Sequence, residues 1–570
     1  MRIDLSEGRS LSGVHAKKLN SIAASIQPLY NDMIARLALG HEDNMDWWVS
    51  AIASRNIYSS SLFQDCCRAF LVGELLDEGN ISEIIVPSLP LAEVVRSLCR
   101  KKNLDVGIVS AEGRLGLIRD LLGALSDYSQ DIIKSLYRFW LCRGTHARTG
   151  KEIPPNCTLI DLFVLDQSFL NGDYQDRYYD DFGGYVREED AESFVFIPTL
   201  EVRFRNTRRL LQALRGSRRR FLLLEDVINA RDYLYAWAYP CRAIRLCPPQ
   251  TMLGDIDVTP LVRRTWQQHL FLGSSAEALL KFRFARRLKE RGVSIRLIVD
   301  WFENQDIDKG ANAGFRRYFP DTPIVGYQGF GATPYYLCAY PTSTEYRSRV
   351  LPLSVAVCGR SWAAERKRYC PELDVVTAPA FRYRRVWRER KEKQAAASFL
   401  VLIILPLDLE NALGLLKFAV ELPGRPEAKA YSFLLKPHPA LPVDVLLSRS
   451  GLSLPSSLAV VKGDFSAYLE QTDAIVGNAS STLLEAVAWG IPVVVAGSLA
   501  GITHNPIPAT ISQDIWRLCY TTEEIAAALE HFRSMTDADR QRLAAIGRDV
   551  CAGYFEPVTR EGVRSFLRLP

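Results

Sequence analysis

Residues 472 to 495 read TDAIVGNASSTLLEAVAWGIPVVV, a stretch that contains a strand, a turn of small residues, a helix and a second strand. The apolar run at 474 to 476 predicts the first strand, and 481 to 489 predicts a helix that ends at Gly490. The segment 491 to 495 predicts the second strand. Short apolar strands that alternate with helices are typical of parallel sheets covered by helices. The stretch therefore predicts part of an open α/β sheet.

The same alternation surrounds this stretch and defines a C-terminal domain. Strands are predicted at 398 to 405 (SFLVLIIL) and 431 to 435, and helices at 411 to 421 and 465 to 471. Before them, residues 381 to 397 (FRYRRVWRERKEKQAAA) are strongly basic and end in small residues, which is a break in composition. We place the domain boundary there, so the predicted domains are 1–390 and 391–570.

The N-terminal domain contains a second set of short apolar runs separated by amphipathic stretches. Strands are predicted at 81–86, 158–165, 193–198, 221–224, 295–299 and 353–358, and helices at 91–102, 205–214 and 276–291. Two such units in tandem predict an α/β fold of two Rossmann-like domains that face a cleft, with ligands at the carboxyl ends of the strands. No GxGxxG, GxxxxGK[ST] or GxSxG motif follows a strand, which disfavours dinucleotide, P-loop and serine-hydrolase functions.

Composition and charge are typical of a globular protein. Of the 570 residues, 48% are hydrophobic and 24% charged, and the 35 glycines and 29 prolines are ordinary numbers. A net charge of +5 at this length does not imply a nucleic-acid binder. The 12 cysteines show no zinc spacing, so reduced thiols and no metal site are expected. Without a signal-like N-terminus or an apolar run of about 20 residues, a cytoplasmic location is expected.

The tetrapeptide KPHP follows directly on the strand predicted at 431 to 435. Pro437 and Pro439 prevent continuation of the strand and stiffen the loop that holds His438 at the carboxyl edge of the sheet. A histidine in this position can donate a hydrogen bond to a phosphate oxygen, and Lys436 precedes it in the same predicted donor site. The alternative is a loop histidine that caps a nearby carbonyl group.

About 40 residues later, a small-residue turn leads into a helix whose first turn carries hydroxyl groups. The free N–H groups and the positive dipole end of such a helix bind anions, and Ser480 and Ser481 are additional donors. Glu485 lies one turn into the helix, where it can reach the ribose of a nucleotide whose phosphate rests on the helix start. Asn478 and Thr482 belong to the same predicted donor site. The alternatives are N-capping for the serines and a favourable acid near the helix start for Glu485.

A polar segment, DWFENQDIDKG at 300 to 310, follows the strand predicted at 295 to 299. Its position predicts a loop on the cleft side of the N-terminal domain. Carboxylates, amides and an indole supply hydrogen-bond partners for sugar hydroxyls and an apolar face for the ring, which makes Trp301, Asn304 and Gln305 candidate acceptor or sugar contacts. A solvated loop is the alternative.

A second polar and aromatic stretch, DYQDRYYDD at 173 to 181, follows the strand predicted at 158 to 165. It predicts another loop toward the cleft or a substrate-binding lid, and Tyr178 is its candidate sugar contact. An ordinary surface loop is the alternative.

KPHP and the later SST, Glu485 and G-x-P pattern together resemble the C-terminal nucleotide-binding half of GT-B glycosyltransferases. The similar branch has HP and SS motifs and includes bacterial sialyl- and polysialyltransferases, capsule Kdo transferases and, more distantly, teichoic-acid CDP-glycerol glycerophosphotransferases. The resemblance covers residues 398 to 550. It implies that His438, Ser480 and Ser481 contact the phosphate of CMP, and that Glu485 contacts the ribose. The whole chain is also similar to bacterial surface carbohydrate biosynthesis proteins that contain WFENQxxDKG.

The resemblance implies a metal-independent glycosyltransferase that moves Kdo or a related ulosonic acid from a CMP-activated donor to a growing bacterial surface polysaccharide. The C-terminal domain would hold the nucleotide sugar, a substrate rather than a cofactor, and the N-terminal domain the acceptor. In an inverting reaction Glu303 is the first candidate base and Asp300 the second, whereas in a retaining reaction one carboxylate forms a covalent intermediate. The sequence does not choose between them.

Two other functions stay open, namely a CDP-glycerol or CDP-ribitol phosphotransferase and a non-catalytic nucleotide-sugar-binding subunit of a capsule assembly complex. Basic residues cluster at 215–220, 281–291 and 382–393, and these clusters indicate which partners the protein could bind. Polybasic patches attract anionic lipid headgroups, so peripheral contact with the inner membrane is expected for an enzyme that extends a lipid-linked glycan. Solvated helix faces are the alternative, and no recognised nucleic-acid module is present.

Overall fold

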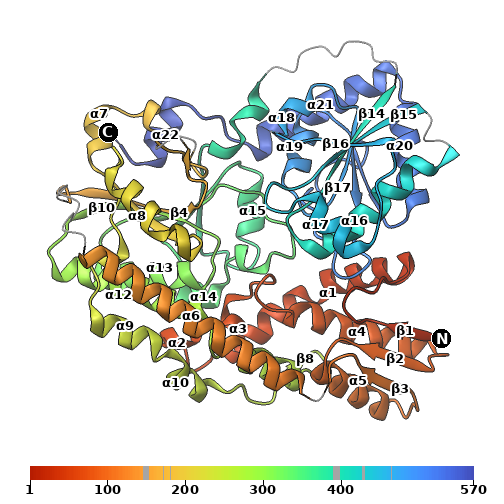
Figure 1. Cartoon of the computed structure of the whole chain (residues 1–570), viewed down its shortest axis with the longest axis horizontal. Helices are drawn as coiled ribbons and strands as arrows, with labels where there is room; N and C mark the ends of the chain where they lie inside the picture. Colours follow the sequence, from red (N-terminus) through yellow and green to blue (C-terminus); the bar gives the residue numbers. More distant parts are fainter. Residues whose placement is uncertain are drawn as a thin grey trace.

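The computed structural model describes residues 1–113, 115–144, 153–170, 173–179, 182–388, 398–426, 430–463 and 465–569. These residues form three parallel sheets with helices around them and two short hairpins, β5–β6 (Phe169–Leu170, Asp173–Tyr174) and β8–β9 (Met252–Leu253, Ile256–Asp257). One six-stranded sheet belongs to the C-terminal part of the chain, drawn in blue and cyan in Figure 1, and a second belongs to its middle. A three-stranded sheet lies near the N-terminus. The predicted boundary between 390 and 391 lies outside the described residues.

The C-terminal sheet has the order β16-β15-β14-β17-β18-β19, and all neighbouring strands are parallel. Its strands are β14 (Phe399–Ile404), β15 (Tyr431–Lys436), β16 (Leu458–Val460), β17 (Ala474–Gly477), β18 (Val493–Ala496) and β19 (Trp516–Cys519). Val401 and Ile403 pack into one core cluster, and Leu402 and Ile404 pack into another. Burial on both faces explains the unbroken apolar runs. The order is that of a doubly wound fold whose strand order reverses between β14 and β17.

Among the described residues, four α-helices of this domain lie between the strands and two follow the last strand, β19. They are α16 (Leu409–Glu421), α17 (Val443–Ser450), α18 (Ser466–Leu469), α19 (Thr482–Ala488), α20 (Thr522–Arg533) and α21 (Asp537–Tyr554). The sequence analysis predicted three of the six, α16, α18 and α19. Asp408 caps α16 by accepting a hydrogen bond from the backbone N–H of Asn411 at 2.8 Å. After α19, Gly490 has a φ of 71° and packs against the backbone of Ala544 in α21, a conformation and a close approach that favour glycine.

The middle sheet has the order β13-β12-β11-β10-β4-β7, again with all neighbours parallel. Its strands are β4 (Cys157–Leu165), β7 (Phe194–Glu201), β10 (Ile295–Trp301), β11 (Ile324–Gln328), β12 (Ser354–Val357) and β13 (Asp374–Thr377). Strand order reverses between β4 and β10. Gly310 in α13 (Asp306–Tyr318) lies directly against the backbone of Ala278 in α12 (Gly273–Glu290), where a Cβ would collide. The predicted α/β fold with two Rossmann-like domains is confirmed by these two sheets.

The N-terminal sheet is a feature that the sequence analysis did not separate from the rest of residues 1–390. Its elements are β1 (Arg2–Asp4), β2 (Glu83–Val86), β3 (Gly107–Ser110), α1 (Gly13–Leu37), α4 (Leu62–Glu78) and α5 (Leu89–Lys101). Of these elements, the sequence analysis predicted only β2 and α5. It missed β1 and β3 because their short sequences, RID and GIVS, lack a long apolar run. The small sheet has a core of its own, in which Ile22, Leu71 and Val95 are buried.

The remaining α-helices cover the N-terminal and middle sheets. They are α2 (Met45–Trp48), α3 (Ala51–Ser54), α6 (Gly116–Gly144), α7 (Glu188–Glu192), α8 (Thr207–Gly216), α9 (Ala230–Trp237), α10 (Tyr239–Ala243), α11 (Thr259–Gln268), α14 (Ser343–Arg347), α15 (Trp362–Arg366) and α22 (Arg560–Phe566). The long helix α6 lies diagonally across the molecule in Figure 1. Within the described part of the chain, no helix combines the length and the apolar character needed to cross a bilayer.

The prediction of a strand at 221 to 224 is wrong. Phe221 makes only a single bridge to Phe196, and the chain then enters a 3-10 helix, η3 (Leu224–Asp226). The carboxylate of Asp226 accepts a hydrogen bond from the backbone N–H of Leu223 at 3.3 Å and pairs with Arg215 at 3.1 Å. These contacts favour a turn over continued strand pairing.

The last residues of the chain return to the middle sheet. The backbone N–H of Glu556 donates to the carbonyl oxygen of Cys358 at 2.7 Å, and Val563 and Phe566 of α22 join the core around Leu162. This return lies inside the range 391–570 that was predicted as one domain. It ties the C-terminal domain to the middle sheet through contacts that a local pattern does not reveal.

Candidate active site

Each large sheet has one point at which its strand order reverses, and the predicted site segments lie near these points. Ligands of open α/β sheets bind in the crevice outside the carboxyl ends of the strands at such a reversal. KPHP begins in the last residue of β15, and the WFENQ segment begins in the last residue of β10. The segment NASS at 478 to 481 follows β17. The predicted donor and acceptor segments therefore lie at the carboxyl edges of their sheets.

The two donor motifs lie on either side of β14. Lys436 and Gly477 are both register partners of Ile404, so the motifs start at the same height on the sheet. Because neighbouring strands are about 4.8 Å apart, the two loops begin about 10 Å from each other. Ala479 has a φ of 45°, and its backbone N–H donates to the carbonyl oxygen of His504 at 3.1 Å. The structure thus brings together motifs that are about 40 residues apart in the sequence.

The half-buried side chain of His438 is oriented by a local backbone contact. Its Nδ1 accepts a hydrogen bond from the backbone N–H of Ala440 at 3.1 Å. Burial lowers the pKa of His438, and the positive charges of Arg177 and Lys436 lower it further. A neutral imidazole that accepts at Nδ1 carries its proton at Nε2. The arrangement gives a donor at Nε2.

The hydroxyl groups at the start of α19 are half-buried and bond to other hydroxyl groups. Ser480 Oγ and Thr482 Oγ1 are 2.7 Å apart. Ser481 makes no capping bond to a backbone N–H. Simple N-capping therefore does not account for Ser481.

Three further residues of the predicted donor site are buried, and each makes a contact within the protein. Lys436 Nζ donates to the carbonyl oxygen of Gly463 at 2.7 Å, and Asn478 Nδ2 donates to that of Asn411 at 3.5 Å. Glu485 accepts two hydrogen bonds from Arg385, at 2.6 Å from Nε and 3.2 Å from Nη2. Arg385 belongs to the 3-10 helix η6 (Phe381–Trp387), so this pair joins the two large domains. The ribose contact of Glu485 stays a prediction, and it would have to share the carboxylate with Arg385.

In the acceptor half, Glu303 is the best-positioned carboxylate. Its Oε1 accepts a hydrogen bond from Trp301 Nε1 at 2.9 Å, and its Oε2 accepts from Gln305 Nε2 at 2.7 Å and from the Tyr336 hydroxyl at 2.8 Å. The backbone N–H of Glu303 donates to Asp308 Oδ2 at 3.0 Å. The half-buried side chain is thus held in one orientation at the carboxyl edge of the middle sheet.

Trp301 and Asn304, predicted as sugar contacts, are both fully buried. Trp301 packs with its ring centroid 4.5 Å from that of Tyr178, in an edge-on arrangement. Asn304 has a φ of 58° and donates from Nδ2 to the carbonyl oxygen of Cys338 at 2.9 Å. Neither side chain presents an exposed surface for a sugar. Gln305 and Tyr178 are only half-buried and lie closer to the surface.

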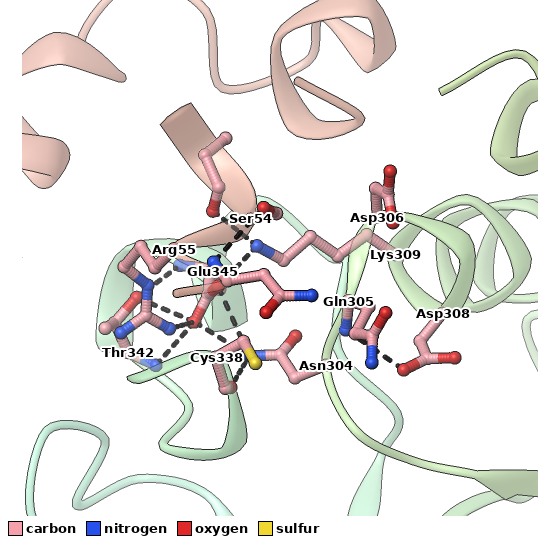
Figure 2. A network of polar contacts seen from close by, with 12 residues as sticks. Ser54, Arg55, Asn304, Gln305, Asp306, Asp308, Lys309, Cys338, Thr342 and Glu345 are labelled. Atoms are coloured by element: carbon pink, nitrogen blue, oxygen red, sulfur yellow. Dashed lines mark hydrogen bonds and ion pairs between the residues drawn. The ribbon is translucent and has the colours of Figure 1, made fainter. Parts of the chain in front are cut away.

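A buried ionic network fixes the WFENQ loop to the N-terminal part of the chain (Figure 2). The carboxylate of Glu345 forms ion pairs with Lys309 Nζ at 2.8 Å and with Arg55 Nη2 at 2.9 Å. Lys309 Nζ also donates a hydrogen bond to the carbonyl oxygen of Ala53. Burial alone would raise the pKa of Glu345, but the charges of Arg55 and Lys309 outweigh it and lower this pKa to about 2. The network holds three segments at fixed positions around Asn304.

Asp300, the second candidate base, lies in the interior at 3% exposure. Its Oδ2 accepts a hydrogen bond from Asn312 Nδ2 at 2.7 Å, and Lys281 nearby pairs with Asp161 at 2.9 Å. Burial and the charge of Asp161 raise the pKa of Asp300 to about 7. The carboxyl group of Asp300 is therefore too deeply buried to touch a substrate, and it can act on the site only through its electrostatic field.

Aromatic and histidine side chains connect the two carboxyl edges. The ring centroid of Tyr336 is 5.4 Å from that of Tyr58, which is 6.3 Å from His504. His504 Nδ1 lies 3.3 Å from Thr333 Oγ1, and burial lowers the pKa of His504 to about 4 against the opposing charge of Asp408. A cavity of about 340 Å³ opens here, and its lining includes Tyr58, Gln64, Asp408, Asn411, Ser498 and His504.

Sequence reasoning missed several residues that shape this site. Lys309 lies inside the motif, but its partners Arg55 and Glu345 are far away in the sequence and carry no local pattern. His504 follows β18, and its position after a strand end is a signal that could have been used. In the part of the chain that the structure describes, no group of three His, Cys, Asp or Glu residues is arranged to hold a metal ion.

Comparisons with known proteins find no matching family model and no matching curated protein. Among solved structures, the chain is similar to a trehalose 6-phosphate synthase from Burkholderia multivorans, with 11% identity over 73% of this chain and 96% of that chain, at a TM-score of 0.42. The glycosyltransferase SnogD from Streptomyces nogalater has 12% identity over 72% and 99%, at a TM-score of 0.38. Values this low assign neither family nor function, and the fold rests on the strand orders described above.

Proposed function

We propose that this chain is a glycosyltransferase that transfers Kdo or a related ulosonic acid from a CMP-activated donor to a growing bacterial surface polysaccharide. The C-terminal sheet would hold the nucleotide and the middle sheet the acceptor. The observation that carries the proposal is the placement of Glu303, with its oriented carboxylate, and of His438 and Ser480 at the carboxyl edges of two Rossmann-like sheets.

The chemistry of the donor edge supports an anionic leaving group. His438 offers an N–H at Nε2, and Ser480 and Ser481 offer hydroxyl groups at the start of α19. Donors of this kind stabilise the negative charge that CMP gains when its bond to the sugar breaks. The same residues carry the resemblance to enzymes that use cytidine nucleotides.

The surroundings of Glu303 support an acidic sugar. Arg382 stacks on Trp301, with its guanidinium carbon 5.8 Å from the ring centroid, and no carboxylate in the described residues pairs with it. Tyr178, Glu303 and Arg382 all contact Trp301, so these three groups lie close together. In a ulosonic acid the carboxylate is attached to the anomeric carbon itself. A cation beside the candidate base, such as Arg382, could therefore bind the carboxylate of a ulosonic acid donor.

The inverting reaction fits this geometry. The Glu303 carboxylate accepts the proton of the acceptor hydroxyl, whose oxygen bonds to the anomeric carbon while the bond from that carbon to the CMP phosphate oxygen breaks. CMP departs with the electron pair, and the donors at His438 and Ser480 receive its charge. Arg382 would keep the sugar carboxylate from repelling Glu303.

The test is a donor panel followed by chromatography of the products. The purified chain is incubated with CMP-Kdo, CMP-N-acetylneuraminic acid, CDP-glycerol or UDP-glucose, with and without a lipid-linked glycan acceptor. Release of CMP together with a lengthened glycan from a CMP-ulosonic donor supports the proposal. Release of CMP from CDP-glycerol instead would indicate a phosphotransferase, and tight binding without any turnover a non-catalytic subunit.

A further inference from the structure

The outer face of α6 is a large apolar surface with no part in the site described above. The residues that form this stripe are between 44% and 66% exposed and are Ile118, Leu122, Leu125, Ile133, Leu136 and Trp140. At about 100° per residue they fall within an arc of about 80° and extend over about 33 Å of the helix. A helix on the surface of a soluble protein normally turns polar residues outward, so this arrangement is inverted.

The inner face of α6 holds the helix on the protein. Tyr128 and Leu141 are buried, and the Tyr128 hydroxyl donates to the carbonyl oxygen of Trp237 at 2.8 Å. Arg264 of α11 pairs with Asp120 of α6 at 2.8 Å. The helix is therefore anchored by one side, and its apolar stripe is left exposed on the other.

A basic rim lies beside the C-terminal half of the stripe. The ring centroid of Tyr137 is 4.8 Å from that of Phe204, which is 47% exposed and begins the short 3-10 helix η2 (Phe204–Asn206) in front of α8. The exposed cations around it are Lys134, Arg203, Arg205, Arg208 and Arg209. We call the stripe and this rim together the α6 surface. The acids next to it among the described residues include Asp127 and Asp131 on α6, Asp166 directly after β4 and Glu201 at the end of β7.

Two cations of this rim pair within the protein, Lys134 with Asp131 at 3.0 Å and Arg203 with Asp166 at 3.7 Å. In the basic clusters that the sequence analysis linked to membranes, many members form ion pairs. These pairs are Arg215–Asp226, Arg219–Asp176, Lys281–Asp161, Arg287–Asp232 and Arg385–Glu485. The arginines at 205, 208 and 209 carry no such pair within the described residues.

We propose that the α6 surface binds the surface of a lipid bilayer that contains anionic headgroups. Leu, Ile and Trp side chains on one face of a helix enter the boundary between headgroups and acyl chains, and basic residues beside them contact the phosphates. The helix would lie on the bilayer, in agreement with the finding that no described helix can cross one. A second copy of the chain is the less fitting partner, because it would bring the same positive rim against this one.

The experiment measures sedimentation of the full chain with vesicles of phosphatidylcholine alone and with 30% phosphatidylglycerol, at low and at physiological salt. The apolar variant is Leu136→Ser/Trp140→Ser, and the charge variant is Arg205→Ala/Arg208→Ala/Arg209→Ala. Val445→Ser, on the exposed face of α17 in the C-terminal domain, is the matched control. Circular dichroism melting of every variant confirms folding.

The parent chain and the Val445→Ser control should bind the anionic vesicles, more weakly at high salt, and should not bind phosphatidylcholine alone. Each arginine near the surface contributes about fivefold in affinity, so the charge variant should lose about a hundredfold. The apolar variant should lose at least tenfold. Absence of binding by the parent chain, or undiminished binding by both folded variants, would overturn the proposal. So would a dimer in light scattering that Leu122→Arg converts to a monomer, because α6 would then be an interface between copies.

Discussion

The hydroxyl of Tyr336 donates to Oε2 of Glu303 at 2.8 Å, and this contact spans 33 residues of the sequence. Together with Gln305 on the same oxygen and Trp301 on the other, it holds the carboxylate from several directions. A carboxylate that is held in this way needs little reorganisation before it accepts a proton. Tyr336 also lies near Tyr58 and so connects the orientation of Glu303 to the N-terminal segment.

Replacement of Glu303 by Gln should separate proton transfer from donor binding. The amide keeps the shape but cannot accept a proton, so transfer should fall by at least about a hundredfold. CMP affinity should stay within about threefold, because the donor motifs lie on the other sheet. Rates with saturating donor and calorimetry with CMP measure the two effects.

The NH2 group of the introduced Gln side chain would face one of the three hydrogen-bond donors that surround Glu303, and that donor would lose its acceptor. The loss should cost about 1–3 kcal/mol of stability. Tyr336→Phe is the control, because it removes one of these donors and leaves the carboxylate able to accept a proton. Transfer by Glu303→Gln at the parent rate would exclude Glu303 as base or nucleophile.

Replacement of Ser480 or of Ser481 by Ala should weaken CMP binding by about tenfold to a hundredfold, and replacement of both should weaken it further. Each hydroxyl that bonds to a phosphate contributes about 1.5–3 kcal/mol. Folding should survive, because both serines are half-buried at the edge of the sheet. Ser448→Ala, an exposed serine on α17, is the matched control for calorimetry. Equal CMP affinity of the double variant and the parent would refute the donor-site assignment.

Replacement of Arg382 by Ala tests the acidic-sugar part of the proposal separately. If Arg382 binds the sugar carboxylate, affinity for CMP-N-acetylneuraminic acid should fall by about tenfold to a hundredfold, while affinity for CMP stays the same. Arg542→Ala, a 56% exposed arginine on α21, is the control. A parallel loss for CMP would place Arg382 at the nucleotide instead, and an unchanged affinity for both would remove it from the donor site.

The sequence predicts most strands of the two large sheets because these strands are buried on both faces, whereas the largely exposed β13 and β16 were not predicted. Runs such as SFLVLIIL leave no other interpretation, and the turns KPHP and NASS have residue types that stop strands and start helices. The strand at 221 to 224 fails for a tertiary reason, because its apolar residues pack into the core while Asp226 and Arg215 hold a turn. The local sequence pattern of residues 221 to 224 gives no sign of the ion pair between Asp226 and Arg215.

The candidate site was predicted in part. Glu303 stands at a strand end in a polar segment, which is a signal that sequence carries. Trp301 and Asn304 share that segment but are buried, and neither composition nor spacing distinguishes them from Glu303. The partners that hold Asn304 in the interior, Cys338 and Glu345, lie 34 and 41 residues away in the sequence and become visible only in the fold.

Replacement of Glu345 by Ala should destabilise the protein by about 3–5 kcal/mol in urea unfolding. The change leaves Lys309 and Arg55 buried without their shared carboxylate. Glu530→Ala is the matched control, because its pair with Arg533 is exposed and should change stability little. A Glu345→Ala variant as stable as the parent would contradict the inferred importance of the network.

The pH dependence of the Glu345 contribution has a definite sign. The pKa of Glu345 is lowered from 4.5 to about 2 in the folded chain. A carboxylate with a depressed pKa contributes stability above the unfolded value, and that contribution is lost as pH falls through the folded value. The stability difference between the parent and Glu345→Gln should therefore be constant above about pH 5 and should narrow toward pH 2.

Asp300→Asn should make the protein more stable at high pH and leave transfer intact. The pKa of Asp300 is raised from 3.8 to about 7, so between these values the folded state keeps a proton that the unfolded state releases. Parent stability should therefore decline as pH rises from about 4 to 7, by about 2–4 kcal/mol from this residue. The Asn side chain stays neutral and can still accept the hydrogen bond from Asn312.

Urea unfolding at pH 5 and pH 8 measures this difference, with the exposed Asp549→Asn on α21 as control. The stability advantage of Asp300→Asn over the parent should be larger at pH 8 than at pH 5, because only about a third of the decline between pH 4 and pH 7 is complete at pH 5. Because Asp300 is only 3% exposed, transfer by this variant should stay within a few-fold of the parent, in contrast to Glu303→Gln. An unchanged pH profile would mean that Asp300 does not titrate in this range, and loss of transfer at full stability would make Asp300, rather than Glu303, the candidate base.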